Sequence, residues 1–155
     1  DGPSIELQRV VRNAFPAQID RPDFEPITTP ETREPMKPVN TADRRIANIA
    51  DAEFRPFVYP DGTALGDAVL QLDDDKPLGE GFHVYRMPAG MTTRGHRHNG
   101  HEQFLILEGE LIENDGTVFR KGDLVFYRNG TEHNSHTPNG CLLAVHIVHG
   151  ETMVD

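Results

Sequence analysis

From residue 55 onward, short apolar runs alternate with clusters of turn-forming residues, and this alternation limits the fold more than any other feature of the chain. Asn114-Asp115-Gly116 and Asn129-Gly130 are typical of tight connections between antiparallel strands. The best candidate for a helix is Thr41 to Glu53, although its apolar residues suit a strand equally well. The pattern predicts an all-β sandwich or barrel of about eight strands. The expected strands span residues 55–59, 68–72, 82–87, 103–112, 117–119, 124–127, 133–137 and 141–149.

The first 44 residues have a different composition. Seven of the 12 prolines lie between Pro3 and Pro38, and proline prevents long regular elements because it lacks an amide proton and fixes φ. We therefore expect an extended Pro-rich arm over residues 1–44 and a β-barrel domain over residues 45–155. Residues 5–27 are too apolar for a solvated linker. We expect them to pack onto a sheet, across a dimer, and a disordered tail is the alternative.

The charge and the cysteine content exclude several classes of protein. Lys and Arg total 15 against 25 Asp and Glu, a formal net charge of −10, so no binding to nucleic acid is expected. No apolar run approaches the ~18 residues of a membrane-spanning helix, so no membrane partner is expected either. Cys141 is the only cysteine, which excludes an intrachain disulfide and a thiolate zinc cluster and leaves the cellular compartment open.

All eight histidines lie in the second half of the chain, a concentration typical of a metal site. Residues two apart in a strand point to the same face, so His96 and His98 share one face. A tight Asn-Gly bend follows and returns Glu102 to the same side. Two imidazoles and a carboxylate on one face are a chelating set for a transition metal. We expect His133 to add a fourth ligand from a neighbouring strand.

On these residues the chain resembles the cupin superfamily. Gly90-x5-His96-x-His98-x3-Glu102-x6-Gly109 matches the first cupin motif, and Gly122-x5-Arg128-x-Gly130-x2-His133-x3-Thr137 is similar to the second. Arg128 and Thr137 depart from the usual Pro and Asn, but neither position is a ligand. The segments 102–110 and 137–143 look like the ChrR-like cupin domain of anti-sigma factors and some dioxygenases. The resemblance covers about residues 82–149. It implies a cupin-type antiparallel β-barrel, a jelly-roll-like double sheet, with one metal ion on His96, His98, Glu102 and His133.

Several further residues are candidates for a role in the site. Tyr85 and Tyr127 are candidate catalytic residues, because a phenol can act as a general acid or base near a metal; barrel or interface aromatics are the alternative. Arg86 and Arg94 would clamp a substrate carboxylate or lie in solvent. Cys141 is expected to be a small buried apolar residue and not a nucleophile. The remaining histidines either support the metal or substrate or belong to the wall and surface: His83, His101, His136, His146 and His149.

The expected function is catalysis by a bound divalent transition metal, with a dioxygenase acting on a small oxygenated molecule as the first hypothesis. Fe(II) is favoured, and Zn, Mn, Ni and Cu accept the same ligands. The alternative is a sensor of a small ligand or oxidant, like the anti-sigma cupins. Those regulators carry a separate sigma-binding domain with a Cys and His zinc motif, whereas residues 1–82 contain no His or Cys. A storage-like structural protein is a third hypothesis. Residues 103–108 are apolar on both strand faces, so a homodimer or the arm is expected to cover the outer face.

Overall fold

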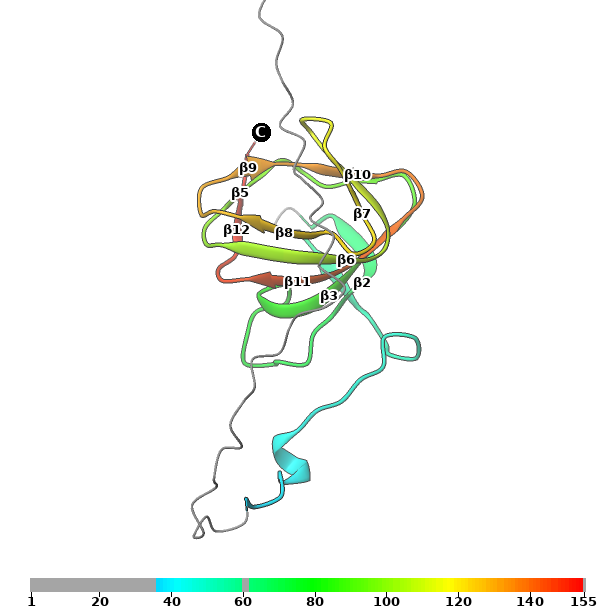
Figure 1. Cartoon of the computed structure of the whole chain (residues 1–155). Coiled ribbons are helices and arrows are strands. Elements are labelled where there is room, and N and C mark those ends of the chain that lie inside the picture. The colour runs from blue at the N-terminus through cyan, green and yellow to red at the C-terminus, as the bar shows by residue number, and fades with distance from the viewer. Residues whose placement is uncertain (1–35, 60–61, 155) are drawn as a thin grey trace, which may run out of the picture. The chain divides into compact units, whose positions relative to one another are not determined.

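The computed structural model describes residues 36–59 and 62–154. The chain divides into two compact units, Asp1–Pro38 and Val39–Asp155, and the described strands lie in the second (Figure 1). The expected packing of residues 5–27 concerns positions outside the described residues, and so does most of the expected arm.

Almost all regular structure in the described residues is β-strand. The helix candidate at residues 41–53 contains only a 3-10 turn, Thr41–Asp43, in which the Asn40 side chain accepts a hydrogen bond from the Ala42 amide at 3.1 Å. A longer helix does not form because Ile46 is 80% exposed, and a short helix needs an apolar face packed against the domain. The strands are β1 (Arg55–Val58), β2 (Ala64–Leu70), β3 (Gly81–Met87), β4 (Met91–Thr92), β5 (His96–His98), β6 (Glu102–Glu113), β7 (Val118–Arg120), β8 (Leu124–Tyr127), β9 (Glu132–His133), β10 (Ser135–Thr137), β11 (Cys141–Ile147) and β12 (Glu151–Met153).

The described strands form two antiparallel sheets. The larger sheet has the order β1-β2-β3-β11-β6-β10-β4, with β7 and β8 also paired to β6. It curls on itself, and the smaller sheet, β12-β5-β9, stands at the left of the view in Figure 1. The predicted all-β, double-sheet barrel is confirmed. The predicted hairpin between β6 and β7 is confirmed as well, since the Glu113 amide donates to the Thr117 carbonyl at 2.9 Å.

Strand β6 changes the side to which its residues point. Ile106 faces the interior at an even position, whereas Glu113 faces it at an odd one. The change comes from a β-bulge, where the register against β11 shifts. Gly109 lies beside the shift with a φ of 78°, and a Cβ there would collide with the carbonyl oxygen of Gly140. Glycine is therefore required at position 109, and the bulge turns the end of β6 inward.

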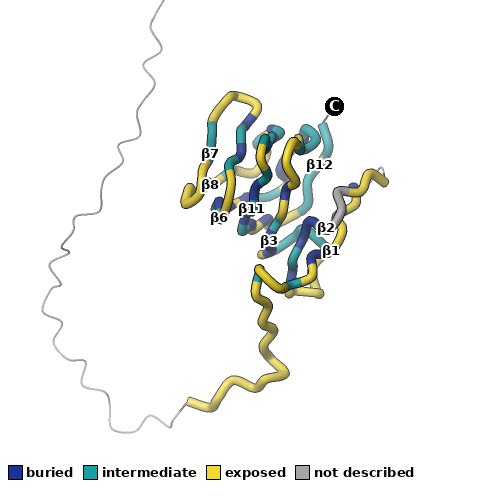
Figure 2. The backbone as a smooth tube through the Cα atoms, turned by 90° about the vertical axis from the view of Figure 1, so that its right-hand side faces the viewer, coloured by how far each residue is buried: buried dark blue, intermediate teal, exposed yellow. Residues whose placement is uncertain are grey.

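The core lies on the inner face of the curled sheet. Buried and more exposed residues alternate along β11, as expected for a strand with one covered face (Figure 2). Cys141 is 5% exposed and belongs to this core, which confirms its predicted burial. Each large apolar side chain buried there contributes roughly 1.5–3 kcal/mol. The core residues are Met87, Phe104, Ile106, Leu111, Cys141, Leu143, Val145 and Ile147.

The outer face of the same sheet carries large apolar side chains. Phe82, Leu124 and Phe126 are 65%, 73% and 53% exposed. Phe82 and Phe126 lie on one cross-strand row with His146 and Gln103 between them. These two polar residues separate the phenylalanines, so the exposed apolar side chains do not form one continuous row on this face. Among the described residues, no helix has both the length and the apolar character needed to cross a bilayer.

Candidate metal centre

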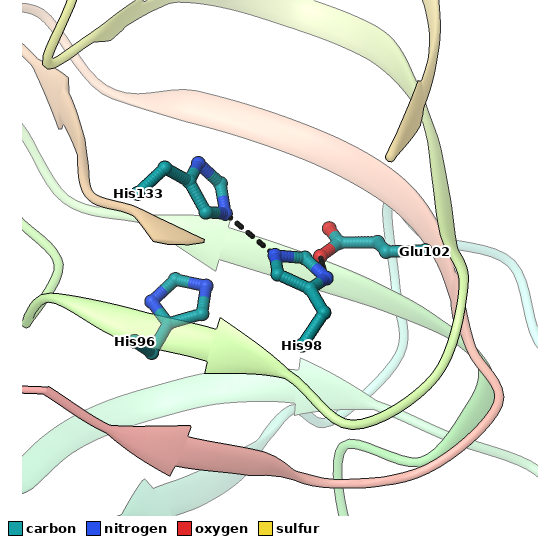
Figure 3. A group of neighbouring side chains, drawn as sticks. All are labelled: His96, His98, Glu102 and His133. Atoms are coloured by element: carbon teal, nitrogen blue, oxygen red, sulfur yellow. Dashed lines mark hydrogen bonds and ion pairs between the residues drawn. The ribbon is translucent and has the colours of Figure 1, made fainter. Parts of the chain in front are cut away.

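Four side chains with metal-ligating atoms converge at the edge of the barrel. One such atom from each of His96, His98, Glu102 and His133 lies within 4.8 Å of the others (Figure 3). The structure thus brings together the four residues predicted as ligands. They come from three strands, since His96 and His98 lie on β5, Glu102 begins β6 and His133 ends β9.

The pairing of β5 with β9 creates this convergence. His96 lies opposite His133 in the antiparallel register. Along β5 the two histidines are buried, while Arg97 between them is exposed, so both imidazoles point inward. A hydrogen bond from the Gly130 amide to the His98 carbonyl at 2.9 Å holds the turn before β9 against the end of β5.

The partners of the ring nitrogens show how the imidazoles are oriented. Nδ1 of His96 lies 2.9 Å from the Arg94 carbonyl oxygen, which can only accept a hydrogen bond, so this nitrogen carries a proton and Nε2 is left to the cluster. His98 and His133 face each other through their Nε2 atoms at 2.8 Å. Nδ1 of His133 lies 2.6 Å from Oε2 of Glu113. Two imidazoles are thus fixed from behind, and their Nε2 atoms are directed into the cluster.

Two buried atoms of the cluster lack a hydrogen bond, and a cation in the cluster would interact favourably with both residues. Nδ1 of His98 and Oε2 of Glu102 lie 3.0 Å apart, yet both are buried without a hydrogen-bond partner, because their geometry does not make a hydrogen bond. Buried polar atoms without a hydrogen bond are costly, even where an opposite charge lies nearby as it does here. Three imidazole nitrogens and one carboxylate oxygen are a donor set that Fe(II), Zn, Mn, Ni and Cu accept. The residues present therefore fit a divalent transition metal.

Burial and neighbouring charges shift the pKa values around the cluster. Burial lowers the pKa of His96, and the nearby rings of His133 and His98 lower it further. For His98, burial lowers the pKa, but the Glu102 carboxylate outweighs this and the net shift is upward. Burial, reinforced by the negative charge of Glu102, raises the pKa of Glu151 to about 7. The imidazoles thus differ in how strongly protons compete for them.

A partly open cavity of about 170 Å³ lies beside the cluster. His96, Glu102 and His133 all contribute to its wall, so the cluster opens onto this space. Most other wall residues are apolar and come from the inner faces of β2, β3, β6 and β11. The apolar and aromatic part of the wall consists of Phe57, Tyr59, Val69, Leu78, Tyr85, Met87, Phe104, Leu111, Leu143, Val145 and Ile147.

The two candidate catalytic tyrosines have different positions. Tyr85 lines the cavity, and burial raises the pKa of its hydroxyl far above the ordinary value. Tyr127 does not belong to the described cavity wall; its ring packs against His133, with the centroids 4.7 Å apart, and against His98 at 5.6 Å. Burial and the charge of Glu113 raise the pKa of Tyr127 as well. Both phenols keep their protons at neutral pH.

The arginines are not placed to clamp a substrate in this cavity. The Arg86 guanidinium lies 3.6 Å from the ring centroid of Phe54, and that of Arg94 lies 6.0 Å from the ring of Tyr59. Neither is part of the cavity wall in the described residues.

The other histidines separate into one inner residue and four outer ones. His83 is 5% exposed and lines the cavity, with its Nδ1 3.2 Å from the Gly81 carbonyl oxygen. His101 is exposed and accepts a hydrogen bond from the Asn129 amide at 3.0 Å. His136 contacts the Thr92 hydroxyl at 2.9 Å. The two histidines on and after β11, His146 and His149, are exposed.

Two acidic residues in the site were not predicted from the sequence. Glu113 lies behind His133, and Glu151 lines the cavity with Oε1 3.4 Å from Nε2 of His96. The bulge beside Gly109 reverses the side to which Glu113 points, and a motif glycine next to it is the signal that could have indicated it. The short strand β12 pairs with β5 over a long sequence distance, and no local pattern predicts that pairing.

Comparisons with known proteins agree with this architecture. A family model described as the ChrR Cupin-like domain matches residues 43–151. An acetylacetone dioxygenase from Acinetobacter johnsonii is 15% identical, over 79% of this chain and 85% of that chain, with a TM-score of 0.56. An RmlC-like cupin protein from Ralstonia eutropha JMP134 is 18% identical, over 70% of both chains, with a TM-score of 0.54.

A second protein from Ralstonia eutropha JMP134, with a cupin-like fold and unknown function, matches over 49% of this chain at 18% identity and a TM-score of 0.44. The chain spans about half of that protein, 52% of its length. No curated protein matches the chain. At these identities the solved structures show similarity of fold alone.

Proposed function

The chain belongs to the ChrR cupin-like domain family, and we propose that it is a metal-dependent enzyme, a dioxygenase that acts on a small oxygenated molecule. The observation that carries this proposal is the cavity of about 170 Å³ whose wall includes His96, Glu102 and His133. A structural ion is closed off by four protein ligands. Here the proposed ligands border a largely apolar, partly open cavity, which is the setting of a site that receives a small molecule.

The proposed ligands are His96, His98, Glu102 and His133, with Fe(II) as the favoured ion. A metal held there would supply Lewis acidity toward substrate oxygen atoms and, in the case of iron, reactivity toward O₂. The protein's own part is to hold the substrate and exclude water. The hydroxyl of Tyr85, which burial keeps protonated, is the proposed hydrogen-bond donor to a substrate oxygen at the cavity wall.

The charges around the cavity support an uncharged substrate. Glu80, Glu102 and Glu151 line it, and no Lys or Arg appears among the described residues of its wall. Apart from the proposed metal ion, a substrate carboxylate would find no cationic partner in this wall, and the carboxylates of Glu80 and Glu151 would repel it. A neutral β-diketone or hydroxyketone fits better than a small carboxylic acid. Acetylacetone is a suitable first probe, because a protein of the same fold is described as an acetylacetone dioxygenase.

Oxygen uptake tests the proposal. The chain would be reconstituted with Fe(II) without oxygen and then exposed to O₂ with β-diketones, hydroxyketones and thiol acids. We expect uptake and product formation with a neutral substrate, abolished in Glu102→Ala and retained in His101→Ala, which changes an exposed histidine outside the cluster. No uptake with the iron form, and no product with the zinc and manganese forms, would refute catalysis. A ligand-dependent or oxidant-dependent change in partner binding would then support the sensor.

The proposal also includes a homodimer. Phe82 and Phe126, on the outer face of the large sheet, are exposed in the single chain. A second copy would bury these side chains, and a two-fold interface buries the same patch on both subunits.

A further inference from the structure

A buried carboxylate outside the four-residue cluster lies directly behind it. Glu113, the last residue of β6, is 7% exposed, and its Oε2 lies 2.6 Å from Nδ1 of His133. Its other oxygen, Oε1, accepts a hydrogen bond from the Ser135 hydroxyl at 2.6 Å. Carboxylates are seldom buried unless they are paired. Ser135, Glu113 and His133 therefore form a hydrogen-bonded series that ends at the cluster.

The fold builds this series from two independent features. The bulge beside Gly109 turns Glu113 to the interior, where an unbroken strand would point it outward. Strand β10 then pairs with the end of β6, and Ser135 lies directly opposite Glu113 in the register. His133 and Ser135, two positions apart, are both buried and flank the carboxylate. A conformationally costly bulge is thus used to place a charged group in the interior.

The contact determines which nitrogen of His133 is available. An ionised carboxylate only accepts hydrogen bonds, so at 2.6 Å the Nδ1 atom of His133 is the donor. The neutral ring then has its lone pair on Nε2, which points at His98 inside the cluster. His96 is oriented in the same way by a backbone carbonyl, which carries no net charge. The carboxylate behind His133 therefore adds a charge as well as an orientation.

We propose that Glu113 is a positioning residue for the metal: it fixes the Nδ1-protonated form of His133 and makes Nε2 a stronger donor, while Ser135 holds the carboxylate in place. The inference rests on the metal site of the proposed function. A carboxylate behind a ligating histidine typically changes metal affinity 10- to 100-fold. A merely structural Glu113 would affect stability and leave the affinity per folded molecule unchanged.

The test uses Glu113→Gln, which keeps the shape of the side chain and removes its charge. His133 and Ser135 contact different oxygens of Glu113, and in glutamine one of these oxygens becomes an NH₂ donor, so the amide cannot take over both hydrogen bonds in the same geometry. The dissociation constant for Zn²⁺ would be measured by competition with a chromophoric chelator, and the visible spectrum of the Co²⁺ form would report the ligand field.

The matched control is Glu108→Gln, an exposed glutamate on the same strand. If Glu113→Gln does not fold, Ser135→Ala is measured in its place. This variant keeps the Glu113 carboxylate and removes only the hydrogen bond from the serine hydroxyl.

We expect zinc to bind Glu113→Gln about 10- to 100-fold more weakly than the wild type, and the cobalt spectrum of this variant to be shifted. In Ser135→Ala, zinc affinity should also fall, but by a smaller factor, below about tenfold. Glu108→Gln should bind as the wild type does. In metal-free, ¹⁵N-labelled wild-type protein at alkaline pH, the ring of His133 should carry its proton on Nδ1. A His133 ring protonated only on Nε2, or equal zinc affinity in the wild type and Glu113→Gln, would overturn this inference alone. A wild-type chain that binds neither zinc nor cobalt would overturn the proposed metal site as well.

Discussion

The Nε2 atoms of His98 and His133 lie 2.8 Å apart, although the residues are separated by 35 positions in the chain. Two imidazole nitrogens at this distance either share a proton or both direct lone pairs at a cation. The pairing of β5 with β9, in which His96 lies opposite His133, places the rings of His98 and His133 on the same side. The register of these two short strands therefore sets the spacing between two of the proposed ligands.

Acid should release the metal, and the pKa of His98 should set the pH at which release begins. The carboxylate of Glu102 outweighs burial and raises the pKa of His98 above its ordinary value, so protons compete for this ring at higher pH than for a free imidazole. Burial lowers the pKa of His96, which stays available to lower pH. We expect affinity to be constant at alkaline pH and to fall about tenfold per pH unit for each proton displaced, starting above the ordinary imidazole pKa of about 6.5. Chelator competition at a series of pH values measures this, and a flat profile down to about pH 5 would contradict it.

The thiol of Cys141 should be unreactive in the folded protein. Burial raises its pKa to about 11, so only about one molecule in a thousand carries the thiolate at pH 8, and the thiolate is the reactive form. We expect slow modification by a disulfide reagent in the native state and rapid, stoichiometric modification after unfolding in denaturant. Equal rates in the two states would show that Cys141 is accessible.

Replacement of Gly109 should destabilise the protein more than replacement of Gly90. Both glycines have a φ of 78°, but a Cβ at Gly90 meets no atom within 4 Å, whereas one at Gly109 would collide with the Gly140 carbonyl. The positive φ alone costs an alanine about 1–2 kcal/mol. We expect Gly90→Ala to lose about that much free energy of unfolding and Gly109→Ala to lose clearly more, measured by denaturant titration. Equal losses would mean that the bulge adjusts without cost.

Charge on the outer sheet face should separate the proposed homodimer. Phe82→Asp and Phe126→Asp each place an unpaired carboxylate on the exposed row, which would be buried against a second copy at high cost. We expect light scattering to give twice the mass of one chain for the wild type and the mass of one chain for either variant. Val58→Asp, at an exposed position on β1, is the control and should remain dimeric. A wild-type protein with the mass of one chain at every concentration tested would refute the dimer.

Much of the fold and the cluster could be predicted because both depend on local patterns. Alternation by two places His96 and His98 on one face, and the Asn-Gly turns delimit the strands on either side. Turn glycines such as Gly116, with a φ of 85°, mark a hairpin that any sequence reading can find. Metal ligands close in sequence follow directly from such rules.

The other parts of the site depend on features without a local pattern. The bulge changes the inward positions of β6 from even to odd, so simple alternation places Glu113 on the wrong side. Glu151 reaches His96 only because β12 adds to the edge of β5, a pairing between distant segments. His83 on β3 belongs to the cavity wall together with Val145, which lies opposite it on β11. These relationships need the register of paired strands, which the sequence alone does not determine.

The number of metal ions per chain in wild-type protein and in His98→Ala tests the central claim most directly. Protein prepared without oxygen would be loaded with Fe(II) or Zn²⁺, freed of excess ion and analysed by elemental mass spectrometry, with circular dichroism as the check of folding. We predict one ion per wild-type chain, one in His101→Ala, and essentially none in a folded His98→Ala, because this change removes the central ring of the cluster. Equal metal content in the wild type and His98→Ala would contradict the proposed site.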